Sequence, residues 1–345
     1  MNYFLSLCVI IKDESNLIEF ILYHWLIGVE HFYLYDNESN PSLKNILNHY
    51  IFKKICTIIY FPGKGVQMNA YNHCLKTYGE KTKWLGIIDG DEYIFPKKHY
   101  SLRDFLSEYD NYHAIGINWI LYGTSFHETK QKGFIIDNYR YCSNKQDKHI
   151  KSIFKPQYTK NCYNQHYVEL YDPLKYTDPK KNIIFGPFNN IENTNIIQIN
   201  HYVSKSFEDL FDKYNRGKAC GNGEYDIIYS HTENNDIKDD TICEKYLIHL
   251  KKIYDIVVNT NWEIYKILNS DLEDKYSTSN EYYNHLFRFG INENRFYKIT
   301  DKYPNFNINY YGNNYPELNY LSDLELEKHY IKFGYYEERV CNKLL

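Results

Sequence analysis

The residues best suited to chemistry are the run Asp89-Gly90-Asp91-Glu92, which directly follows the apolar residues 84–88. Carboxylate oxygens are the ligands that hard divalent cations prefer, and a bound cation can neutralise the charge of a diphosphate. The glycine between the two aspartates permits a close approach of the backbone. An ordinary acidic turn is the alternative interpretation. The position after an apolar strand favours a metal-diphosphate site, because ligands bind at strand ends in open α/β folds.

The elements that must position this run alternate along the first half of the chain. Continuous apolar stretches predict strands at residues 3–11, 31–35, 55–61, 84–88 and 114–121. Apolar residues at helical spacing predict helices at residues 15–27, 42–50, 67–78 and 102–109. This order indicates an α/β fold with a largely parallel sheet and helices on both faces.

The middle of the chain is polar and interrupted by prolines, so it predicts fewer elements. Short strands are expected at residues 183–185 and 196–201, and helices at 206–214 and 242–258. The second strand ends in His201. We therefore expect a first domain over residues 1–258 and a helical region over residues 259–345.

The helical region contains an internal repeat of the form H-x4-G-x2-E-x-R. One copy begins at His285 and the other at His329, 44 residues apart. Each copy is expected to be a loop, a helix and a glycine at the helix end. The pattern resembles a short repeat often appended to glycan-handling proteins. A helical cap that binds no ligand is the alternative interpretation.

Composition excludes several classes of protein. The chain has 345 residues, with Lys+Arg at 40 and Asp+Glu at 44, so it lacks the basic excess of a nucleic-acid-binding protein. Its 43% hydrophobic and 24% charged residues exclude bulk disorder. The 39 tyrosines are typical of an A+T-rich genome, such as that of a low-GC microbe or a large DNA virus.

The same sequence gives expectations about the compartment. Eight cysteines occur without any C-x-x-C pair, which favours reduced and mostly buried thiols. No run of about 18 apolar residues predicts a membrane-spanning helix. Residues 3–11 lack the basic start and the cleavage site of a signal peptide. A cytoplasmic location is therefore expected, while nothing in the sequence indicates an oligomeric state.

Several short segments together are similar to glycosyltransferase family 92, over residues 9 to about 217. They are Lys12-Asp13-Glu14, His24-Trp25, the run from Gly28 to Phe32, Tyr35-Asp36-Asn37-Glu38-Ser39, Gln67, Ala70-Tyr71-Asn72-His73-Cys74, Lys83-Trp84, the run from Asp89 to Tyr93, Tyr122-Gly123-Thr124-Ser125, Lys151, Lys155-Pro156, Asn200-His201-Tyr202 and Lys205-Ser206. The resemblance implies the GT-A fold of nucleotide-sugar-dependent enzymes. It further implies Mn²⁺ (or Mg²⁺), a UDP-sugar such as UDP-galactose as donor, and inverting transfer to a glycan acceptor.

The resemblance also implies a donor site. Lys12, Glu14 and Asp36 would follow the first two strands and contact the nucleotide, although Asp36 could instead close a turn. Asp89 would lie near the ribose and the metal, and Asp91 would ligate the metal directly. His201 would be a third protein ligand, with a buried structural histidine as the alternative.

Further residues are expected around the diphosphate and the acceptor. Lys205, Arg216 and Lys218 could neutralise the departing diphosphate or be ordinary surface residues. His127 and Glu128 are the favoured candidates for the catalytic base, and Glu92 and Asp226 are others. Trp119 and Tyr122 could stack on a sugar ring or belong to the core.

Other functions share part of this pattern. A nucleotidyl enzyme on a related α/β fold would share the Asp-x-Asp metal site. A non-catalytic glycan-binding protein on a decayed glycosyltransferase fold would use the repeats. A metal-dependent hydrolase is disfavoured because the fourteen histidines include no H-E-x-x-H and no H-x-H.

Overall fold

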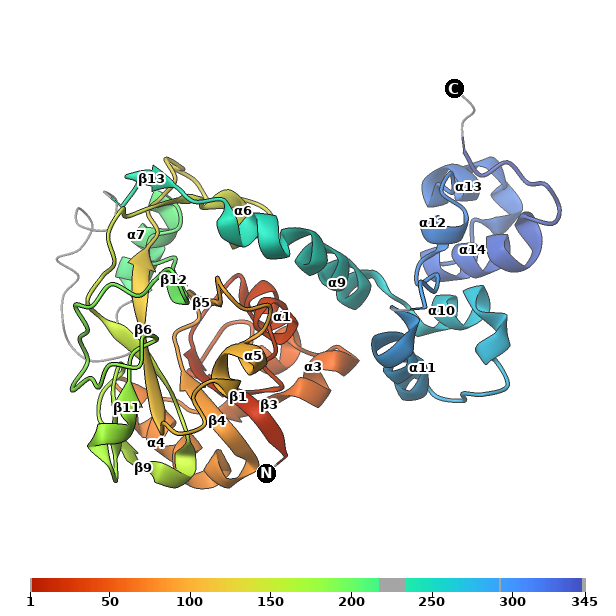
Figure 1. Cartoon of the computed structure of the whole chain (residues 1–345). Coiled ribbons are helices and arrows are strands. Elements are labelled where there is room, and N and C mark those ends of the chain that lie inside the picture. Colours follow the sequence, from red (N-terminus) through yellow and green to blue (C-terminus); the bar gives the residue numbers. More distant parts are fainter. Residues whose placement is uncertain (1, 217–233, 292, 343–345) are drawn as a thin grey trace. The chain divides into compact units, whose positions relative to one another are not determined.

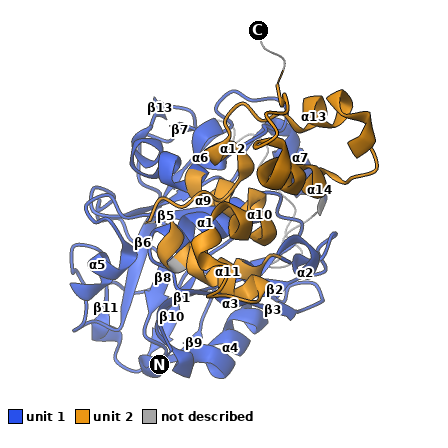
Figure 2. Ribbon diagram, turned by 90° about the vertical axis from the view of Figure 1, so that its right-hand side faces the viewer, with its two compact units in different colours: residues 1–48, 52–251 blue, residues 49–51, 252–345 orange. Residues whose placement is uncertain are grey.

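The computed structural model describes residues 2–216, 234–291 and 293–342. The chain divides into two compact units, shown in Figure 2. Unit 1 comprises residues 1–48 and 52–251, and unit 2 comprises residues 49–51 and 252–345. The division falls inside helix α9 (Ile248–Asn259), as does the boundary expected at 258/259.

Four strands of the nine-stranded main sheet in the described part of unit 1 are parallel neighbours, in the order β3-β2-β1-β4. These strands are β1 (Tyr3–Ile11), β2 (His31–Asp36), β3 (Cys56–Tyr60) and β4 (Thr82–Ile87). Figure 1 labels β1, β3 and β4. Seven consecutive residues of β1 are buried, because its apolar run has no polar face to offer to water. The predicted strand at residues 3–11 is thereby confirmed.

The rest of the sheet is mixed, so the predicted parallel arrangement is uninterrupted only over these four strands. The sheet continues through β8 (Ile150–Phe154), β6 (Ala114–Leu121), β12 (Gln198–His201) and β5 (Glu92–Phe95), and β11 (Tyr176–Thr177) pairs with β6. β8 is antiparallel to both β4 and β6, and β5 is antiparallel to β12. β12 is parallel to β6, so β4, β6 and β12 run in the same direction.

Helices and shorter elements connect the strands. The helices are α1 (Leu17–Leu26), α2 (Leu43–Ile46), α3 (Tyr50–Ile55), α4 (Gln67–Tyr78), α5 (Leu102–Ser107), α6 (Ile135–Asn138) and α7 (Phe207–Arg216). Two small antiparallel pairs join β9 (Thr159–Cys162) to β10 (Val168–Leu170) and β7 (Tyr141–Cys142) to β13 (Ile237–Lys238). Single 3₁₀ turns are η1 (Gly79–Lys81), η2 (Pro156–Tyr158) and η3 (Pro173–Lys175).

Some predicted elements differ from the observed ones. No strand forms at residues 183–185, where Ile183 makes only an isolated bridge to Thr177 and Phe185 is exposed. The long helix predicted at 242–258 begins as a π-helical turn, η4 (Cys243–Leu247), before α9. The helix predicted at 42–50 is only the short α2, which ends at Ile46, and a second helix, α3, begins at Tyr50 and continues to Ile55.

Unit 2 is helical and holds two small apolar clusters. Beyond α9 it contains α10 (Trp262–Leu268), α11 (Ser279–His285), α12 (Ile299–Lys302), α13 (Ile308–Asn314) and α14 (Asp323–His329). The π-helical turns η6 (Leu286–Gly290) and η8 (Tyr330–Gly334) continue α11 and α14, and η5 (Ser270–Leu272) and η7 (Pro316–Leu318) are 3₁₀ turns. One cluster centres on Tyr265, Tyr282 and Leu286, and the other on Tyr311, Leu326 and Tyr330.

The sequence repeat corresponds to a structural repeat. Both α11 and α14 begin with a capping box, formed by Thr278 with Glu281 and by Ser322 with Glu325. The same capping box in both copies explains why each helix starts at the same position of the repeat.

The remaining repeat residues contact one another. The hydroxyl of Tyr265 lies 2.9 Å from His285 Nδ1, and the hydroxyl of Tyr311 lies 2.8 Å from His329 Nδ1. Arg295 pairs with Asp271 and Glu293, and Arg339 pairs with Glu317 and Glu337. The repeat motif is therefore a self-contained packing unit.

Two expectations concern the surroundings of the chain. No helix among the described residues is long and apolar enough to cross a membrane. Seven of the eight cysteines are described, and all seven are free thiols. Cys220 lies outside the described residues.

Candidate functional site

The candidate site lies where β1, β2, β4 and β12 end at the same edge of the sheet (Figure 1). The chain adds β2 and β3 on one side of β1 and β4 on the other, which makes the gap between β1 and β4 a topological switch point. Glu14 follows β1, and Asp89 and Asp91 follow β4. Because ligands bind at such points, the topology brings the predicted residues to the expected place.

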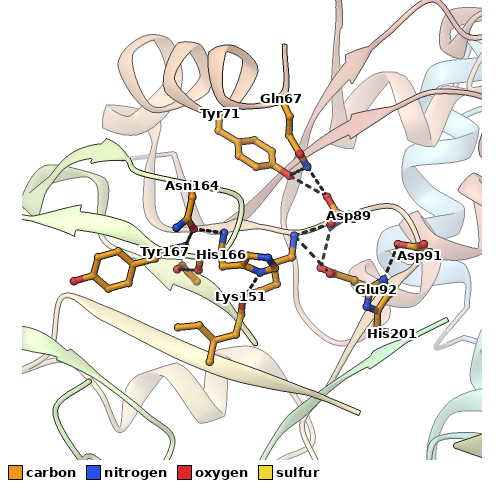
Figure 3. Close-up of polar contacts among 12 residues, drawn as sticks. Gln67, Tyr71, Asp89, Asp91, Glu92, Lys151, Asn164, His166, Tyr167 and His201 are labelled. Atoms are coloured by element: carbon orange, nitrogen blue, oxygen red, sulfur yellow. Dashed lines mark hydrogen bonds and ion pairs between the residues drawn. The ribbon is translucent and has the colours of Figure 1, made fainter. Parts of the chain in front are cut away.

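Asp89 is held by three donors from two elements, as Figure 3 shows. Its Oδ1 accepts from Gln67 Nε2 at 2.8 Å and from the Tyr71 hydroxyl at 3.2 Å. Its Oδ2 accepts from Lys151 Nζ at 2.7 Å. Burial raises the pKa of this carboxyl, but the nearby Lys151 ammonium outweighs burial and the pKa is lowered. Asp89 is therefore ionised and fixed in orientation.

Lys151 is the cation beneath this site, and its side chain is 1% exposed. Besides Asp89 it faces Glu92, with 3.5 Å between Nζ and Oε1. Desolvation lowers the Lys151 pKa, but Asp89 and Glu92 together raise it above its ordinary value. Glu92 is fully buried and accepts the Asp89 N–H at 3.0 Å, and burial raises its pKa well above its ordinary value.

Asp91 faces the other way and meets the side chains of a histidine and a lysine. Its Oδ1 lies 3.6 Å from His201 Nε2, and its Oδ2 lies 2.5 Å from Lys213 Nζ. The pairing of β12 with β5 places His201 opposite Glu92, and the Tyr202 N–H donates to the Asp91 carbonyl at 2.9 Å. Burial opposes ionisation, yet Lys213 and His201 hold the pKa of Asp91 well below its ordinary value.

A cavity of about 320 Å³ opens beside Asp91. Its walls carry three lysines, Lys130, Lys205 and Lys213, and acidic side chains that include Glu14. Lys205 Nζ forms an ion pair with Glu14 Oε1, and both side chains are 11% exposed. The cavity therefore offers both ammonium groups for an anion and carboxylates for a cation or for hydroxyl donors.

The donor set at this edge fits a divalent cation only in part. Among the described residues, no group of three or more His, Cys, Asp or Glu side chains is placed to hold a metal. Asp91 and His201 converge, and His201 Nδ1 is buried without a hydrogen-bond partner. Asp89 has both oxygens occupied by Gln67, Tyr71 and Lys151. Asp91 Oδ2 is occupied by Lys213 Nζ at 2.5 Å, so Oδ1 is the Asp91 oxygen that faces His201. Two protein ligands with oxygens of a diphosphate and water would suit Mn²⁺ or Mg²⁺.

The residues predicted to contact the nucleotide lie at the ends of β1 and β2. Ile11 pairs with Asp36, so the loops after these strands are neighbours. Asp36 accepts the Ser39 N–H at 2.9 Å and the Leu43 N–H at 3.0 Å, which is the turn that sequence analysis named as the alternative. Lys12 is exposed on the loop after β1.

Several other predicted residues lie outside this cluster or outside the described residues. Arg216 is the last residue of α7, and Lys218 and Asp226 fall outside the described residues. His127 Nε2 lies 3.1 Å from the Asn138 carbonyl oxygen, and Glu128 is exposed. The carbonyls of these two residues accept the N–H groups of Phe207 and Glu208 at the start of α7. Neither side chain lines the cavity beside Asp91.

The segment from Tyr122 to Ser125 has a structural role that its sequence did not reveal. Gly123 N–H donates to the Asn234 carbonyl at 3.1 Å, and Ser125 N–H donates to Asn235 Oδ1 at 2.8 Å. A Cβ on Gly123 would lie 2.7 Å from the Asn234 carbonyl oxygen. Tyr122 is fully buried, so it belongs to the core.

Sequence reasoning gave no role to Lys151, Lys213, Gln67 or Tyr71. Lys151 stands in an otherwise apolar strand, which is a usable signal because an unpaired lysine is rarely buried. Lys213 stands on a polar helix, where nothing distinguishes it from its neighbours. Gln67 and Tyr71 are one helical turn apart on α4, a spacing that places both on one face.

Comparison with known proteins first identifies the class of protein. Two plant proteins, both named as members of one glycosyltransferase family, align over 68% of this chain. The one from Ricinus communis is 23% identical over 246 residues, and the one from Arabidopsis thaliana is 22% identical over 255 residues. A third, from Oryza sativa subsp. japonica, is 28% identical over 114 residues, which is 32% of this chain and 20% of that protein.

The particular family is glycosyltransferase family 92. Its family model matches residues 4–233, and the chain belongs to this family. The alignments cover 41% of the Ricinus protein and 40% of the Arabidopsis protein, so the chain spans less than half the length of these relatives. A crystal structure of a putative glucose-1-phosphate thymidylyltransferase from Bacillus anthracis shares 8% identity over 44% of this chain and 72% of that chain. Its TM-score of 0.29 carries no argument about the fold.

Proposed function

We propose that this chain moves a hexose, galactose or a similar sugar, from a UDP-sugar to a hydroxyl group of a glycan or glycoconjugate, with inversion at the anomeric carbon. The fold proposed for unit 1 is the GT-A type. The observation that carries the proposal is the convergence of Asp91 and His201 beside a lysine-lined cavity at the switch point of the sheet. Membership of glycosyltransferase family 92 supports the same reaction class.

Each part of the donor then has a matching set of residues. Asp91 and His201 would hold Mn²⁺ or Mg²⁺, which when bound neutralises the diphosphate and its departing charge. Lys205 and Lys213 lie in the cavity wall, where their ammonium groups stabilise that negative charge. Asp89, held by Lys151, supplies a fixed carboxylate beside the metal ligand.

The nucleoside would lie over the ends of β1 and β2. Glu14 and Asp36 would accept hydrogen bonds from uracil N–H and ribose hydroxyl groups, Asp36 in addition to the Ser39 and Leu43 N–H groups that it already accepts. Lys12 and Arg216 are further proposed contacts to the nucleotide and its phosphates. His127 and Glu128 stay a prediction for the base.

Thermal stability with Mn²⁺ and UDP tests this proposal. A ligand at about 100 times its dissociation constant stabilises the folded state by about 2.7 kcal/mol, and this raises the melting temperature by roughly 5–10 °C. We expect that shift in the wild type and its loss in Asp91→Ala. The matched control is Asp110→Ala, because Asp110 forms only a surface ion pair with Lys83 and its side chain is 61% exposed.

The outcomes separate the proposal from its alternative. A shift with UDP and Mn²⁺ that survives in Asp110→Ala and disappears in Asp91→Ala supports the donor site, and turnover of UDP-sugars is then screened. The absence of any shift with Mn²⁺ and any common nucleoside diphosphate, in folded wild type, would overturn the donor site and favour a non-catalytic glycan-binding protein.

A further inference from the structure

A histidine-carboxylate pair, Asp147 and His149, lies between β6 and the chain segment around Phe188. His149 Nδ1 is 2.7 Å from Asp147 Oδ1, and the same oxygen accepts the His149 backbone N–H at 2.8 Å. The carboxylate facing Nδ1 favours the tautomer that carries its proton on Nδ1, in which Nε2 is the acceptor. No described residue makes a hydrogen bond to Nε2. The side chain of His149 is 32% exposed, so Nε2 is available to a substrate.

Backbone pairing on both sides fixes this segment in place. Trp119 N–H donates to the His149 carbonyl at 3.2 Å, and Asp147 N–H donates to the Trp119 carbonyl at 2.9 Å. On the other side, His149 pairs with Phe188 in an isolated bridge. The side-chain amide of the fully buried Asn118 donates a hydrogen bond to the Asp147 carbonyl at 3.0 Å. The imidazole is thus held by a rigid support, as a catalytic group requires.

The pair lies one aromatic ring away from the proposed metal ligand. The Trp119 ring contacts the His201 ring with centroids 4.4 Å apart, and it stacks on the His149 ring with centroids 5.1 Å apart. Lys151 Nζ, which holds Asp89, lies 5.9 Å from the Trp119 ring centroid. His149 therefore belongs to the same strand-end region as Asp89 and His201.

An exposed aromatic surface adjoins His149. The Phe188 ring is 45% exposed and lies 4.9 Å from the His149 ring in an edge-on arrangement. Trp119 is partly buried behind it. Aromatic faces bind the apolar C–H faces of sugar rings, and the neighbouring polar atoms receive the hydroxyl groups. Lys148 Nζ lies over the Phe188 ring, 4.9 Å from its centroid, so it is the exposed remainder of the ring that, together with His149, forms a surface suited to a carbohydrate acceptor.

We propose that His149 is the general base that activates the acceptor hydroxyl, that Asp147 positions it, and that Phe188 packs against the acceptor sugar. The proposal rests on the proposed function. The acceptor O–H gives its proton to His149 Nε2, and its oxygen forms a bond to the anomeric carbon of the donor. The bond from that carbon to the diphosphate oxygen breaks, and its electron pair leaves with UDP. The proton then passes from Nε2 to solvent.

The same observations explain why His127 and Glu128 are less suited to this role. His127 Nε2 faces a backbone carbonyl, and Glu128 lies in the loop after β6, where its carbonyl accepts the N–H of Glu208 at the start of α7. Glu92 is fully buried beside Lys151 and so cannot meet an acceptor from solvent. Of the bases that sequence analysis named within the described residues, none combines an exposed acceptor atom with a carboxylate partner.

The test compares His149→Gln with His99→Gln in the full chain. His99 is the matched control, because His99 Nε2 pairs with Glu108 at 2.8 Å and lies on a different part of unit 1. Transfer from UDP-galactose with Mn²⁺ is measured to methyl galactosides, and hydrolysis to free galactose is measured in parallel, since water then takes the place of the acceptor. We expect His149→Gln to lower kcat by about 10²- to 10⁴-fold for both reactions, and His99→Gln to leave it unchanged.

Two further variants separate a catalytic from a structural role. Asp147→Asn keeps the shape but lets Nε2 carry the proton, so kcat falls while the KM for the donor stays the same; Asp147→Glu restores part of the rate. Phe188→Ala raises the KM for the methyl galactoside and changes hydrolysis little, because water needs no stacking surface.

Nucleotide binding keeps this proposal separate from the proposed function. If wild type shows the UDP and Mn²⁺ thermal shift and turnover, and His149→Gln keeps the shift but loses turnover, the base is supported. If His149→Gln keeps both the shift and a kcat within about threefold of wild type, the base assignment is overturned while the donor site stands. If wild type neither binds UDP nor turns over a UDP-sugar, the proposed function fails and this inference fails with it.

Discussion

Buried polar side chains occur in both compact units, but they are balanced differently. In unit 2 the histidines and arginines of the repeat are matched by partners within the same copy. His285 meets Tyr265, and Arg295 meets Asp271 and Glu293. The second copy reproduces the arrangement through His329 and Arg339. A polar group that recurs with its partner at every copy is explained by packing alone.

In unit 1 the buried charges do not cancel in pairs. Lys151 faces two carboxylates, and Asp91 faces Lys213 and His201. Buried atoms without hydrogen-bond partners include Glu92 Oε1, His201 Nδ1 and Trp119 Nε1. Such atoms are costly unless a ligand completes them, and others lie elsewhere in unit 1, such as Trp84 Nε1 and His113 Nδ1. The functional region is therefore marked by such atoms occurring together with clustered charges at one strand edge. The comparison teaches that recurrence of polar residues indicates structure, and incomplete pairing indicates function.

The largest effect that tests this comparison is expected for Lys151→Met. Removing the cation leaves the fully buried Glu92 and the partly exposed Asp89 without their ammonium partner, and breaking a buried ion pair costs about 3–5 kcal/mol of folding free energy. Denaturation by urea, followed by tryptophan fluorescence, measures the loss, because three of the four tryptophans (Trp25, Trp84 and Trp119) belong to unit 1.

Lys130→Met is the matched control for that experiment. Lys130 pairs with Asp212 at the surface, where both side chains are about half exposed, and we expect a loss below about 1 kcal/mol. An equal loss in the two variants would contradict the view that the Lys151 cluster holds concentrated, uncompensated charge.

A smaller effect is expected in unit 2, where Gly334 lies against Tyr311. A Cβ at residue 334 would lie 2.2 Å from the Tyr311 hydroxyl and 3.0 Å from its ring carbon. Overpacking of this kind costs about 1–3 kcal/mol, so Gly334→Ala should lower the unfolding free energy of unit 2 by that amount and leave nucleotide binding unchanged. Thermal unfolding followed by circular dichroism measures it.

A double substitution sharpens the same test. Tyr311→Phe removes the atom that clashes, so it should recover part of the loss in Gly334→Ala, and a double-mutant cycle reports the coupling. Gly312→Ala, within α13, is the control. A Cβ at residue 312 would meet only the flexible end of the Leu326 side chain, at 3.2 Å. Additive losses for Gly334→Ala and Tyr311→Phe would show that the two residues do not interact.

The sequence predicted those parts of the fold that depend on local pattern. β1, β6 and α4 have the predicted bounds, because uninterrupted apolar runs and regular helical spacing need no distant partner. The strand edge that carries Asp89 and Asp91 followed from the same pattern. β8 was missed because Lys151 interrupts its apolar pattern. The carboxylates that allow this lysine to be buried come from another part of the chain.

The sequence predicted only those site residues that can be recognised by their own position at the end of a strand. Asp91 and His201 stand at strand ends, but the cation on Asp91 comes from Lys213, 122 residues away along the chain. The pair of Asp147 and His149 is adjacent in sequence, yet its relation to His201 depends on the Trp119 ring between them. Such relations arise from tertiary packing, so no local pattern carries them.

The smallest effect concerns Glu19, a buried carboxyl in unit 1 that no cation contacts directly. Its oxygens accept the N–H groups of Ile135 at 2.7 Å and Ile136 at 3.2 Å, at the start of α6. Burial raises the pKa of Glu19 to about 8, although these two N–H groups lower it in part.

The pH dependence follows from that direction. Below the ordinary pKa of 4.5 the carboxyl is protonated in both states, and its full contribution to stability is present. Between about 4.5 and 8 the unfolded chain loses the proton while the folded chain keeps it, so stability falls as pH rises, by at most about 1.4 kcal/mol per pH unit. Glu19→Gln cannot titrate, so its stability relative to wild type should increase by about 1 kcal/mol per pH unit between pH 5.5 and 7.5.

Urea denaturation of both proteins at pH 5.5, 6.5 and 7.5 measures this difference, and Glu80→Gln, at an exposed position of unit 1, is the control. The control should show a constant difference from wild type. A constant difference for Glu19→Gln as well would mean that the carboxylate stays ionised on the two N–H groups of α6. Glu19 would then be a buried charge without a cationic partner. Incomplete pairing would in that case no longer distinguish the cluster around Asp89 and Asp91 from the rest of unit 1.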